Sequence, residues 1–315
     1  MQRRTFLSAT IASLTASGLA ARAVAGSGGQ PATSPASAPA KPGYEPRDPA
    51  AASKLGWELG TQAWTFRDRT RFEVIDTAKM LGLTCVQLFP GQQLNKDSAE
   101  LKVGPAMTPE QRTMLKDKLK SSGVRAHSFG VIGPGNDEKD VRGFFEFAKD
   151  MGMKGLACEP VIVGNYEDGK PQESWKLLDK LTREYGIYVA CHNHPRPSTY
   201  WKPEVMLTCT RGMNNKLLGA CADTGHWVRS ELGTVDSLKK YEGRIFELHF
   251  KDVKDNADRP WGTGAGDARG QLAELKRQGF KGPIFVEYET GAGTELEMNV
   301  AKCVEFFDRT SRELS

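Results

Sequence analysis

Apolar segments that end in acidic or imidazole side chains constrain this chain more than any other feature. Four segments, each typical of the end of a buried strand, carry Glu159, Asp223, His249 and Glu287. A fifth, His192-Asn193-His194-Pro195, lies among them in the sequence. Charged and imidazole groups at the ends of apolar strands raise the free energy of the fold unless they are paired or bind a cation. We therefore expect these segments to converge on one site.

From Trp57 onward, strand-like segments alternate with helix-like segments. The strand-like segments are short, apolar and often β-branched, as is typical of strands that are buried on both faces. They cover residues 58–64, 85–89, 125–131, 155–159, 187–192, 218–223, 245–250 and 283–288. Helical patterns cover residues 71–81, 109–122, 138–151, 172–185, 234–241, 268–278 and 295–311. About eight such units predict an α/β fold, a single-domain (β/α)8 TIM barrel.

A doubly wound open sheet is the alternative fold. It requires a phosphate-binding glycine-rich loop after an early strand, and we find none there. The glycine-rich segment Gly262-Thr263-Gly264-Ala265-Gly266 follows the seventh strand instead, which favours a loop at the mouth of a barrel. In barrels of this kind, active sites lie at the carboxyl ends of the strands, where the five segments fall.

The N-terminus predicts export. Gln2-Arg3-Arg4-Thr5-Phe6-Leu7 is a twin-arginine pattern, a mildly apolar stretch follows, and Ala23-Val24-Ala25 fits a cleavage site. We predict a Tat signal peptide over residues 1–25, a disordered Gly/Ser/Pro/Ala-rich linker over 26–55, and the barrel over 56–315. A flexible basic N-terminus is the alternative. The protein is expected in the periplasm or outside the cell.

Bulk composition excludes some functions. The formal net charge is +4 and no block of Lys or Arg stands out, so we expect no nucleic-acid partner. After the N-terminus, no apolar run is long enough to span a bilayer. The six cysteines contain no C-x-x-C pair and fall largely in strand-like segments, so we expect buried free thiols.

Two Glu, one Asp and one His make a mixed oxygen and nitrogen site. Such ligands suit Mn²⁺, Mg²⁺ or Co²⁺, and they are compatible with Zn²⁺. Because side chains alternate along a strand, His192 and His194 share a face, as do Glu287 and Glu289. Only one member of each set needs to reach a metal, and the others are free to hold substrate. Two alternatives remain: His226 pairs only with Asp223, and Lys251 and Asp252 form a surface ion pair.

On these residues the chain resembles the xylose isomerase-like TIM-barrel superfamily, the sugar phosphate isomerases and epimerases, over roughly residues 57–312. The segments that look like its branch of inosose dehydratases, keto-glycoside lyases and related isomerases are Asp223-Thr224-Gly225-His226, His249-Phe250-Lys251-Asp252-Val253, Trp261-Gly262-Thr263-Gly264 and Phe285-Val286-Glu287-Tyr288-Glu289. The resemblance implies that Glu159, Asp223, His249 and Glu287 bind a divalent metal. It also implies partnership with an oxidoreductase that forms keto-sugars. Epimerases of this superfamily use a pair of metal-bound glutamates, and the imidazoles of His192-Asn193-His194 depart from that pattern.

The leading hypothesis is a metal-dependent enzyme that abstracts a proton next to the carbonyl of a neutral keto-sugar. Export favours a neutral sugar over a sugar phosphate. As a lyase it would eliminate the β-substituent of a 3-keto-glycoside; the alternative is a sugar isomerase or epimerase. The expected acid/base residues are His192, His194 and His226, together with Glu159 and Glu287, and the expected substrate contacts are Lys251, Trp261 and Glu289. An apurinic-site endonuclease and a non-catalytic sugar-binding protein are weaker alternatives.

Overall fold

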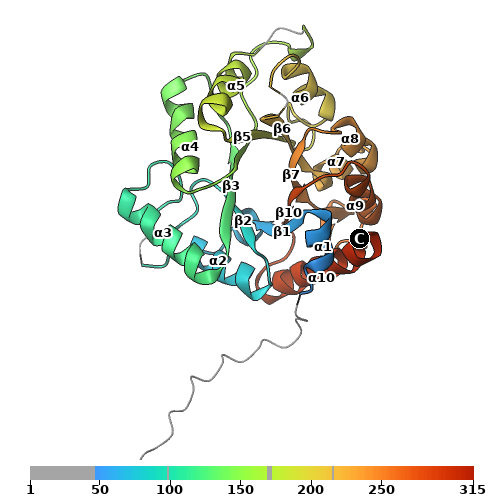
Figure 1. Cartoon of the computed structure of the whole chain (residues 1–315). Helices are drawn as coiled ribbons and strands as arrows, with labels where there is room; N and C mark the ends of the chain where they lie inside the picture. Colours follow the sequence, from blue (N-terminus) through green and yellow to red (C-terminus); the bar gives the residue numbers. More distant parts are fainter. Residues whose placement is uncertain (1–46, 98, 169–171, 215) are drawn as a thin grey trace, which may run out of the picture. The chain divides into compact units, whose positions relative to one another are not determined.

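Eight parallel strands close into a barrel in the computed structural model, which describes residues 47–97, 99–168, 172–214 and 216–315 (Figure 1). The order around the barrel is β1-β10-β7-β6-β5-β4-β3-β2, and all neighbouring pairs are parallel. The prediction of a (β/α)8 barrel is confirmed. The barrel strands are β1 (Trp57–Gln62), β2 (Cys85–Leu88), β3 (Arg125–Ile132), β4 (Gly155–Cys158), β5 (Tyr188–His192), β6 (Leu218–Asp223), β7 (Ile245–Phe250) and β10 (Gly282–Val286).

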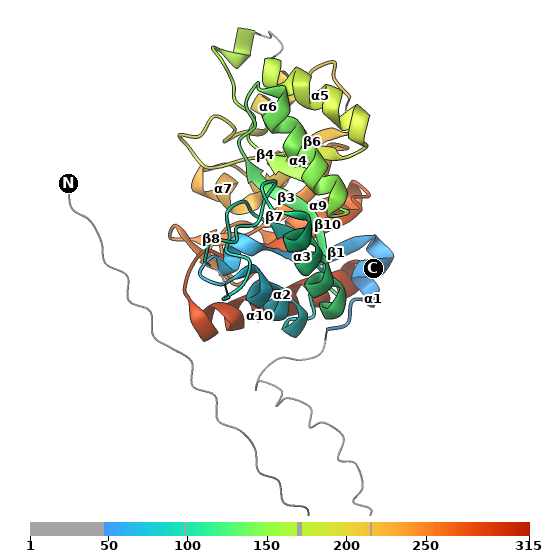
Figure 2. The same ribbon diagram turned by 90° about the vertical axis from the view of Figure 1, so that its left-hand side faces the viewer.

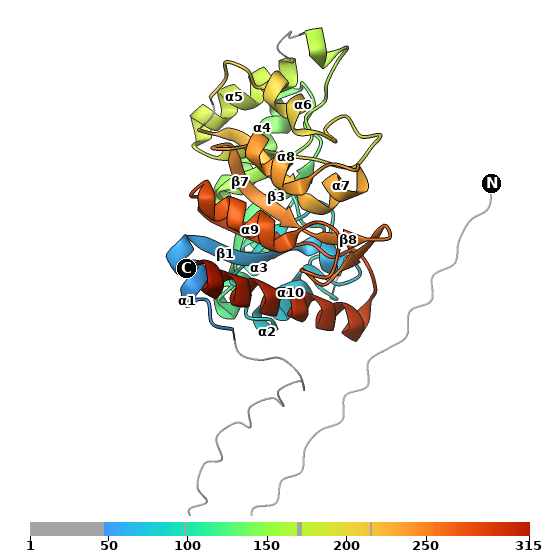
Figure 3. The ribbon, with the colours of Figure 1, turned by 90° about the vertical axis from the view of Figure 1, so that its right-hand side faces the viewer.

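Helices cover the outside of the barrel, as the side views show (Figures 2 and 3). The helices that match predicted ones are α2 (Arg71–Met80), α3 (Pro109–Ser122), α4 (Glu138–Asp150), α5 (Glu173–Tyr185), α8 (Thr234–Lys240), α9 (Ala268–Arg277) and α10 (Gly293–Leu314). The sequence did not predict the short elements α1 (Ala50–Leu55), η1 (Ala63–Phe66), η2 (Tyr166–Asp168), α6 (Pro203–Cys209) and α7 (Thr224–Arg229), or the antiparallel hairpin of β8 (Asp252–Lys254) and β9 (Ala257–Arg259).

The two ends of the barrel carry different elements. In both side views α1 lies at one end, and α7 and the β8–β9 hairpin lie at the other (Figures 2 and 3). The second end is the one at which the barrel strands finish, because α7 follows β6 directly and the hairpin follows β7. The strand-end acids and imidazoles therefore gather at the end that hosts active sites in this fold.

The N-terminal boundary of the barrel needs a correction. The linker was predicted to continue to residue 55, but Ala50–Leu55 form helix α1. Ala51 and Ala52 are buried, and α1 contacts α10. Arg47, still earlier, forms an ion pair of 2.7 Å with Asp308 of α10. The apolar side chains of the short segment explain why it packs. The predicted signal peptide lies outside the described residues.

The glycine-rich segment after β7 is a loop at the barrel mouth, as predicted. The backbone N–H groups of Gly262, Gly264 and Gly266 each donate a hydrogen bond of 2.9 Å to the carboxylate of Asp252. Asp252 is buried and so is Lys251, so the alternative of a surface ion pair is wrong. The loop therefore closes around the carboxylate of Asp252. A Cβ atom at Gly264 or Gly266 would lie within 3.1 Å of that carboxylate, which explains the glycines at these two positions.

Two predictions from composition can be compared with the structure. All six cysteines are free and buried, as expected. Within the described residues, no helix is both long and apolar enough to cross a membrane.

Candidate active site

Four buried side chains at the ends of neighbouring strands converge on one point. His192, Asp223, His249 and Glu287 each direct one nitrogen or oxygen atom into a cluster in which these atoms lie within 4.8 Å of one another. His192 ends β5, Asp223 ends β6, His249 lies near the end of β7, and Glu287 follows β10. Nε2 of His192, Oδ2 of Asp223, Nδ1 of His249 and Oε2 of Glu287 are buried without a well-directed hydrogen bond. Buried ligand atoms that lack hydrogen bonds in this way fit a metal ion, which would contact all four at once.

The local structure at Asp223 explains how this carboxylate is aimed. Asp223 is the N-cap of α7, and its Oδ1 accepts a hydrogen bond of 2.8 Å from the backbone N–H of His226. Its own backbone is fixed on both sides by the side-chain amide of Asn193. Because Oδ1 is used as a helix cap, Oδ2 remains to face the cluster.

A buried ammonium group balances the acids of the cluster. Nζ of Lys251 lies 3.0 Å from Asp223, 3.1 Å from Glu287 and 2.8 Å from Glu289. Burial acts to lower the pKa of Lys251, but these carboxylates outweigh it and raise that pKa above its usual value. Burial likewise acts to raise the pKa of Glu287, and the charge of Lys251 together with His249 lowers it below its usual range. The site is therefore an ionised network at neutral pH.

Glu159 lies apart from this four-atom cluster. Its carboxylate is 3.1 Å from Nδ1 of His192 and in close contact with Nδ1 of His194, and it also accepts a hydrogen bond of 3.3 Å from Ser198. Burial acts to raise the pKa of Glu159, but the two imidazoles lower it to about 2. The structure thus brings three of the four predicted metal ligands together, and His192 occupies the fourth position.

His226 is held in one protonation state and one tautomer. Burial lowers the pKa of His226 well below its usual value, so the ring is neutral. A guanidinium N–H of Arg229 lies 3.3 Å from Nδ1 of His226. Since a guanidinium can only donate, Nδ1 accepts and the ring proton lies on Nε2, 3.5 Å from Oδ2 of Asp223.

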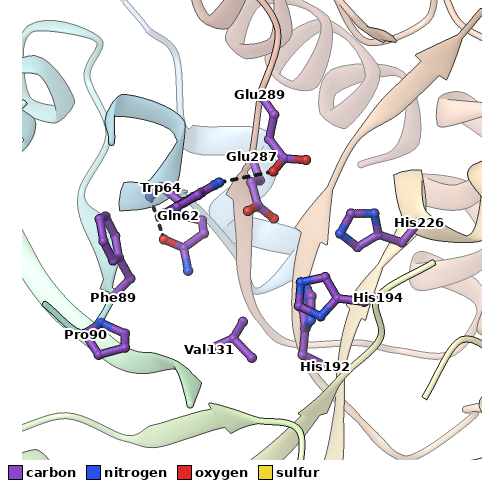
Figure 4. A pocket seen from close by; sticks show the side chains of 10 residues that line it. All are labelled: Gln62, Trp64, Phe89, Pro90, Val131, His192, His194, His226, Glu287 and Glu289. Atoms are coloured by element: carbon purple, nitrogen blue, oxygen red, sulfur yellow. Dashed lines mark hydrogen bonds between the residues drawn. The ribbon is translucent and has the colours of Figure 1, made fainter. Parts of the chain in front are cut away.

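A cavity of about 350 Å³ opens above these groups (Figure 4). Its lining residues are Gln62, Trp64, Phe89, Pro90, Val131, His192, His194, His226, Glu287 and Glu289. Figure 4 shows the three histidines on one side and Trp64 with Phe89 on the other. Glu289, which was predicted as a substrate contact, lines this cavity. Trp261, which was also predicted, is 2% exposed and packs against Phe250 with ring centroids 4.5 Å apart, so it belongs to the core.

Sequence reasoning missed the aromatic wall. Trp64 is 40% exposed, contacts Phe89 edge-on with ring centroids 5.1 Å apart, and donates a hydrogen bond of 3.2 Å to Glu289. The available signal was its position as the last residue of the predicted strand 58–64, at the same end of the barrel as the acids; the observed strand β1 ends two residues earlier. A single tryptophan at such a position is more often a core residue, so it carried no weight in the sequence.

The fold and the site together define a class: a TIM barrel with a cluster of metal-ligand type at the carboxyl ends of its strands. Residues 75–309 match the family described as xylose isomerase-like TIM barrel, and the chain belongs to that family.

Similar proteins agree with this assignment. An inosose dehydratase of Clostridium botulinum (strain Alaska E43 / Type E3) is 26% identical over 37% of this chain and 45% of its own length. The chain thus matches about half the length of that curated relative. Among solved structures, an uncharacterised protein of Parabacteroides distasonis ATCC 8503 is 29% identical with a TM-score of 0.64, over 81% of this chain and 99% of its own. The IolI protein, solved with a bound zinc atom, is 19% identical with a TM-score of 0.60, over 82% and 97%.

Proposed function

We propose that this protein is a divalent-metal-dependent lyase that abstracts a proton next to the carbonyl of a neutral 3-keto-glycoside and eliminates the substituent at C1. The observation that carries the proposal is the set of four converging buried ligand atoms without hydrogen bonds, beside a cavity lined by three histidines. Membership of a family of sugar-modifying barrels supports it.

His192, Asp223, His249 and Glu287 are the residues that would hold the metal. Two imidazole nitrogens and two carboxylate oxygens suit Zn²⁺, Mn²⁺ and Co²⁺. A cation bound there would polarise the substrate carbonyl and stabilise the negative charge that develops on its oxygen. Glu159 would act through His192, because its carboxylate contacts that ring rather than the four-atom cluster.

The side chain that moves the proton in this proposal is His194, which is half exposed and contacts Glu159 through Nδ1, so that Nε2 can accept. It takes the proton from C2 of the 3-keto-glycoside, and the electron pair of that C–H bond forms the C1–C2 double bond as the C1–O bond breaks. The imidazolium then gives this proton to the leaving oxygen, so the products are the free aglycone and an unsaturated keto-sugar. The neutral ring of His226, with its proton on Nε2, can donate a hydrogen bond to the substrate but cannot act as the acid, because loss of that proton would leave an imidazolate.

Several features favour elimination over epimerisation. A two-glutamate epimerase needs a free carboxylate on each face of the sugar, whereas Glu159 is held between two imidazoles. Relatives that are named dehydratases also favour loss of a β-substituent. A second cavity of about 360 Å³ shares Trp64 and Phe89 with the first, which leaves room for an aglycone.

Recognition of a neutral sugar is assigned to Trp64. An exposed indole offers a flat apolar face to the C–H groups of a pyranose, and the hydrogen bond to Glu289 fixes the ring. We further propose export through the twin-arginine pathway and cooperation with an oxidoreductase that supplies the keto-sugar.

The test is to incubate the purified protein with Mn²⁺, Co²⁺ or Zn²⁺ and either a 3-keto-glycoside or a free ketose. Release of the aglycone is expected, as is its loss by at least 100-fold in Glu287→Gln. The exposed Glu305→Gln of α10 serves as the matched control and should retain full activity. If only the ketose is converted, the lyase proposal is wrong and the protein is an isomerase or epimerase. Sugar binding without any turnover would indicate a binding protein.

A further inference from the structure

A closed hydrogen-bonded network of polar side chains fills the barrel beneath the proposed metal ligands. Its members come from five strands and are all buried or nearly so: Gln62 of β1, Gln87 of β2, Ser128 of β3, Tyr188 of β5 and Glu247 of β7. Buried polar groups raise the free energy of a fold unless they are satisfied, and here they bond to one another. None of these residues lies among the four ligand-bearing side chains.

Gln87 is the centre of this network. Its Oε1 accepts hydrogen bonds from Nε2 of His249 at 2.7 Å and from the amide of Gln62 at 2.6 Å. Its Nε2 donates to Glu247 at 2.8 Å and to Ser128 at 3.0 Å. All four hydrogen-bonding positions of the side-chain amide are therefore used.

Glu247 determines which way the Gln87 amide faces. One carboxylate oxygen of Glu247 accepts from Gln87, and the other accepts from Ser128 at 2.6 Å and from Tyr188 at 2.9 Å. A carboxylate in this position requires the NH2 group of Gln87 to point toward it. The carbonyl oxygen of Gln87 must then point toward His249.

We propose that Gln87 and Glu247 are positioning residues that fix His249 in the tautomer with its proton on Nε2, so that Nδ1 is free to bind the metal. Nδ1 is the orphaned atom that lies 2.9 Å from Glu287 and 4.0 Å from Asp223. The reversed amide would direct its NH2 toward Nε2, place the ring proton on Nδ1 and block coordination. The inference rests on the proposed metal site, and second-sphere partners of metal-bound histidines act in this way in general.

The tautomer can be read directly from the metal-free protein. The chain has five histidines, so their ring nitrogens can be assigned by long-range ¹H–¹⁵N NMR correlation. The expected result is a proton on Nε2 of His249, where Gln87 accepts. An unprotonated Nε2 would overturn the inference, whatever the protein does with metal.

Metal affinity gives the second test, measured by calorimetric titration with Zn²⁺ and with Mn²⁺. Gln87→Met removes the acceptor that Nε2–H of His249 needs, and we expect its metal affinity to fall by about 10–100-fold. The double variant Gln87→Glu/Glu247→Gln exchanges acid and amide, and it keeps both a donor toward residue 87 and the acceptor toward His249. We expect its affinity to lie within about threefold of the parent's.

Outcomes of the titrations separate the two proposals. Unchanged affinity in Gln87→Met, or a double variant as weak as Gln87→Met, would refute the positioning role. The variant Gln111→Met on α3 is the control and should bind as the parent does. A parent protein that binds neither metal would refute the proposed function, while the NMR result would still decide the tautomer.

Discussion

At the scale of single residues, the site depends on how buried charges are balanced. Lys251 contacts three carboxylates, and its Nζ lies within about 3 Å of two proposed metal ligands. In the absence of a metal this ammonium supplies the positive charge that the cluster needs. It also repels an incoming cation. Lys251 therefore stabilises the metal-free protein but weakens metal binding, and the two effects can be measured separately.

Lys251→Met should therefore destabilise the metal-free protein and enlarge the stabilisation that metal provides. Removing one partner of a buried ion pair costs about 3–5 kcal/mol. Thermal unfolding in chelator and in Zn²⁺ measures both quantities. Lys240→Met, which removes an exposed pair with Glu204, should change stability by no more than about 1 kcal/mol. An equal metal-induced shift in parent and Lys251→Met would contradict this account.

The glycine at position 264 allows the mouth loop to close on Asp252. A Cβ atom there would lie 2.2 Å from Oδ1 of Asp252 and 2.7 Å from the backbone nitrogen of Val253. We expect Gly264→Ala to reduce the free energy of unfolding by about 1–3 kcal/mol through overpacking. Chemical denaturation measures the change. Gly133→Ala has no neighbour within 4 Å and should leave stability unchanged.

The six thiols give a prediction that needs no variant. All are buried and unpaired, and burial raises the pKa of Cys85, Cys158, Cys191 and Cys221 well above the usual value. We expect the folded protein to react with a thiol reagent such as DTNB at least 100-fold more slowly than the denatured protein, which should titrate six thiols. Rapid reaction of any thiol in the native state would show that the strand or helix that carries it opens readily.

At the scale of elements, helix α1 closes the N-terminal side of the barrel and contacts α10. Ala52 of α1 is 2% exposed, whereas the adjacent Ser53 is exposed. We expect Ala52→Asp to lower the free energy of unfolding by at least about 2 kcal/mol, because a carboxylate would be buried without a partner. Ser53→Asp should have almost no effect. Equal stability of the two variants would mean that α1 does not dock in solution.

Long elements were predictable and short ones were not. The eight barrel strands and seven of the helices were expected within a few residues of their observed bounds, and β6 and β7 agree at both ends. Helix α7 has six residues and strands β8 and β9 have three each, which is too short for a periodic pattern to form. Yet α7 aims Asp223, and η1 carries Trp64. Local elements without a sequence signal therefore position much of the site.

The acids and imidazoles of the candidate site were predictable as residues, but their contacts were not. The sequence places these acids and imidazoles at strand ends, because each follows a short apolar segment and such segments alternate with helical ones. Which atoms converge depends on side-chain directions around a closed barrel, and these decided that His192 rather than Glu159 joins the cluster. Gln87 was unpredictable for a simpler reason: an isolated glutamine inside a strand looks like any other polar residue.

At the scale of the whole molecule, the proposed ligands join four adjacent strands of the barrel wall. They come from β5, β6 and β7 and from the residue that follows β10, and these are consecutive neighbours around the barrel. A metal held by all four would connect these strands at one end. Because the unfolded chain does not assemble such a site, metal binding should stabilise the fold as a whole.

We therefore predict that metal raises the melting temperature of the parent protein. At a metal concentration of 100 times the dissociation constant, the stabilisation is about 2.7 kcal/mol. For a domain of this size each kcal/mol shifts the melting temperature by about 2–4 °C, so a rise of about 5–10 °C is expected and should be reversed by chelator. Asp223→Asn should abolish the rise, because the neutral amide is a poor ligand and Asp223 lies at the centre of the cluster. Asp236→Asn, an exposed acid on α8, should leave the rise intact. If Zn²⁺, Mn²⁺ and Co²⁺ all leave the parent's melting temperature unchanged, Lys251 alone balances the cluster and the four converging ligand atoms do not form a metal site.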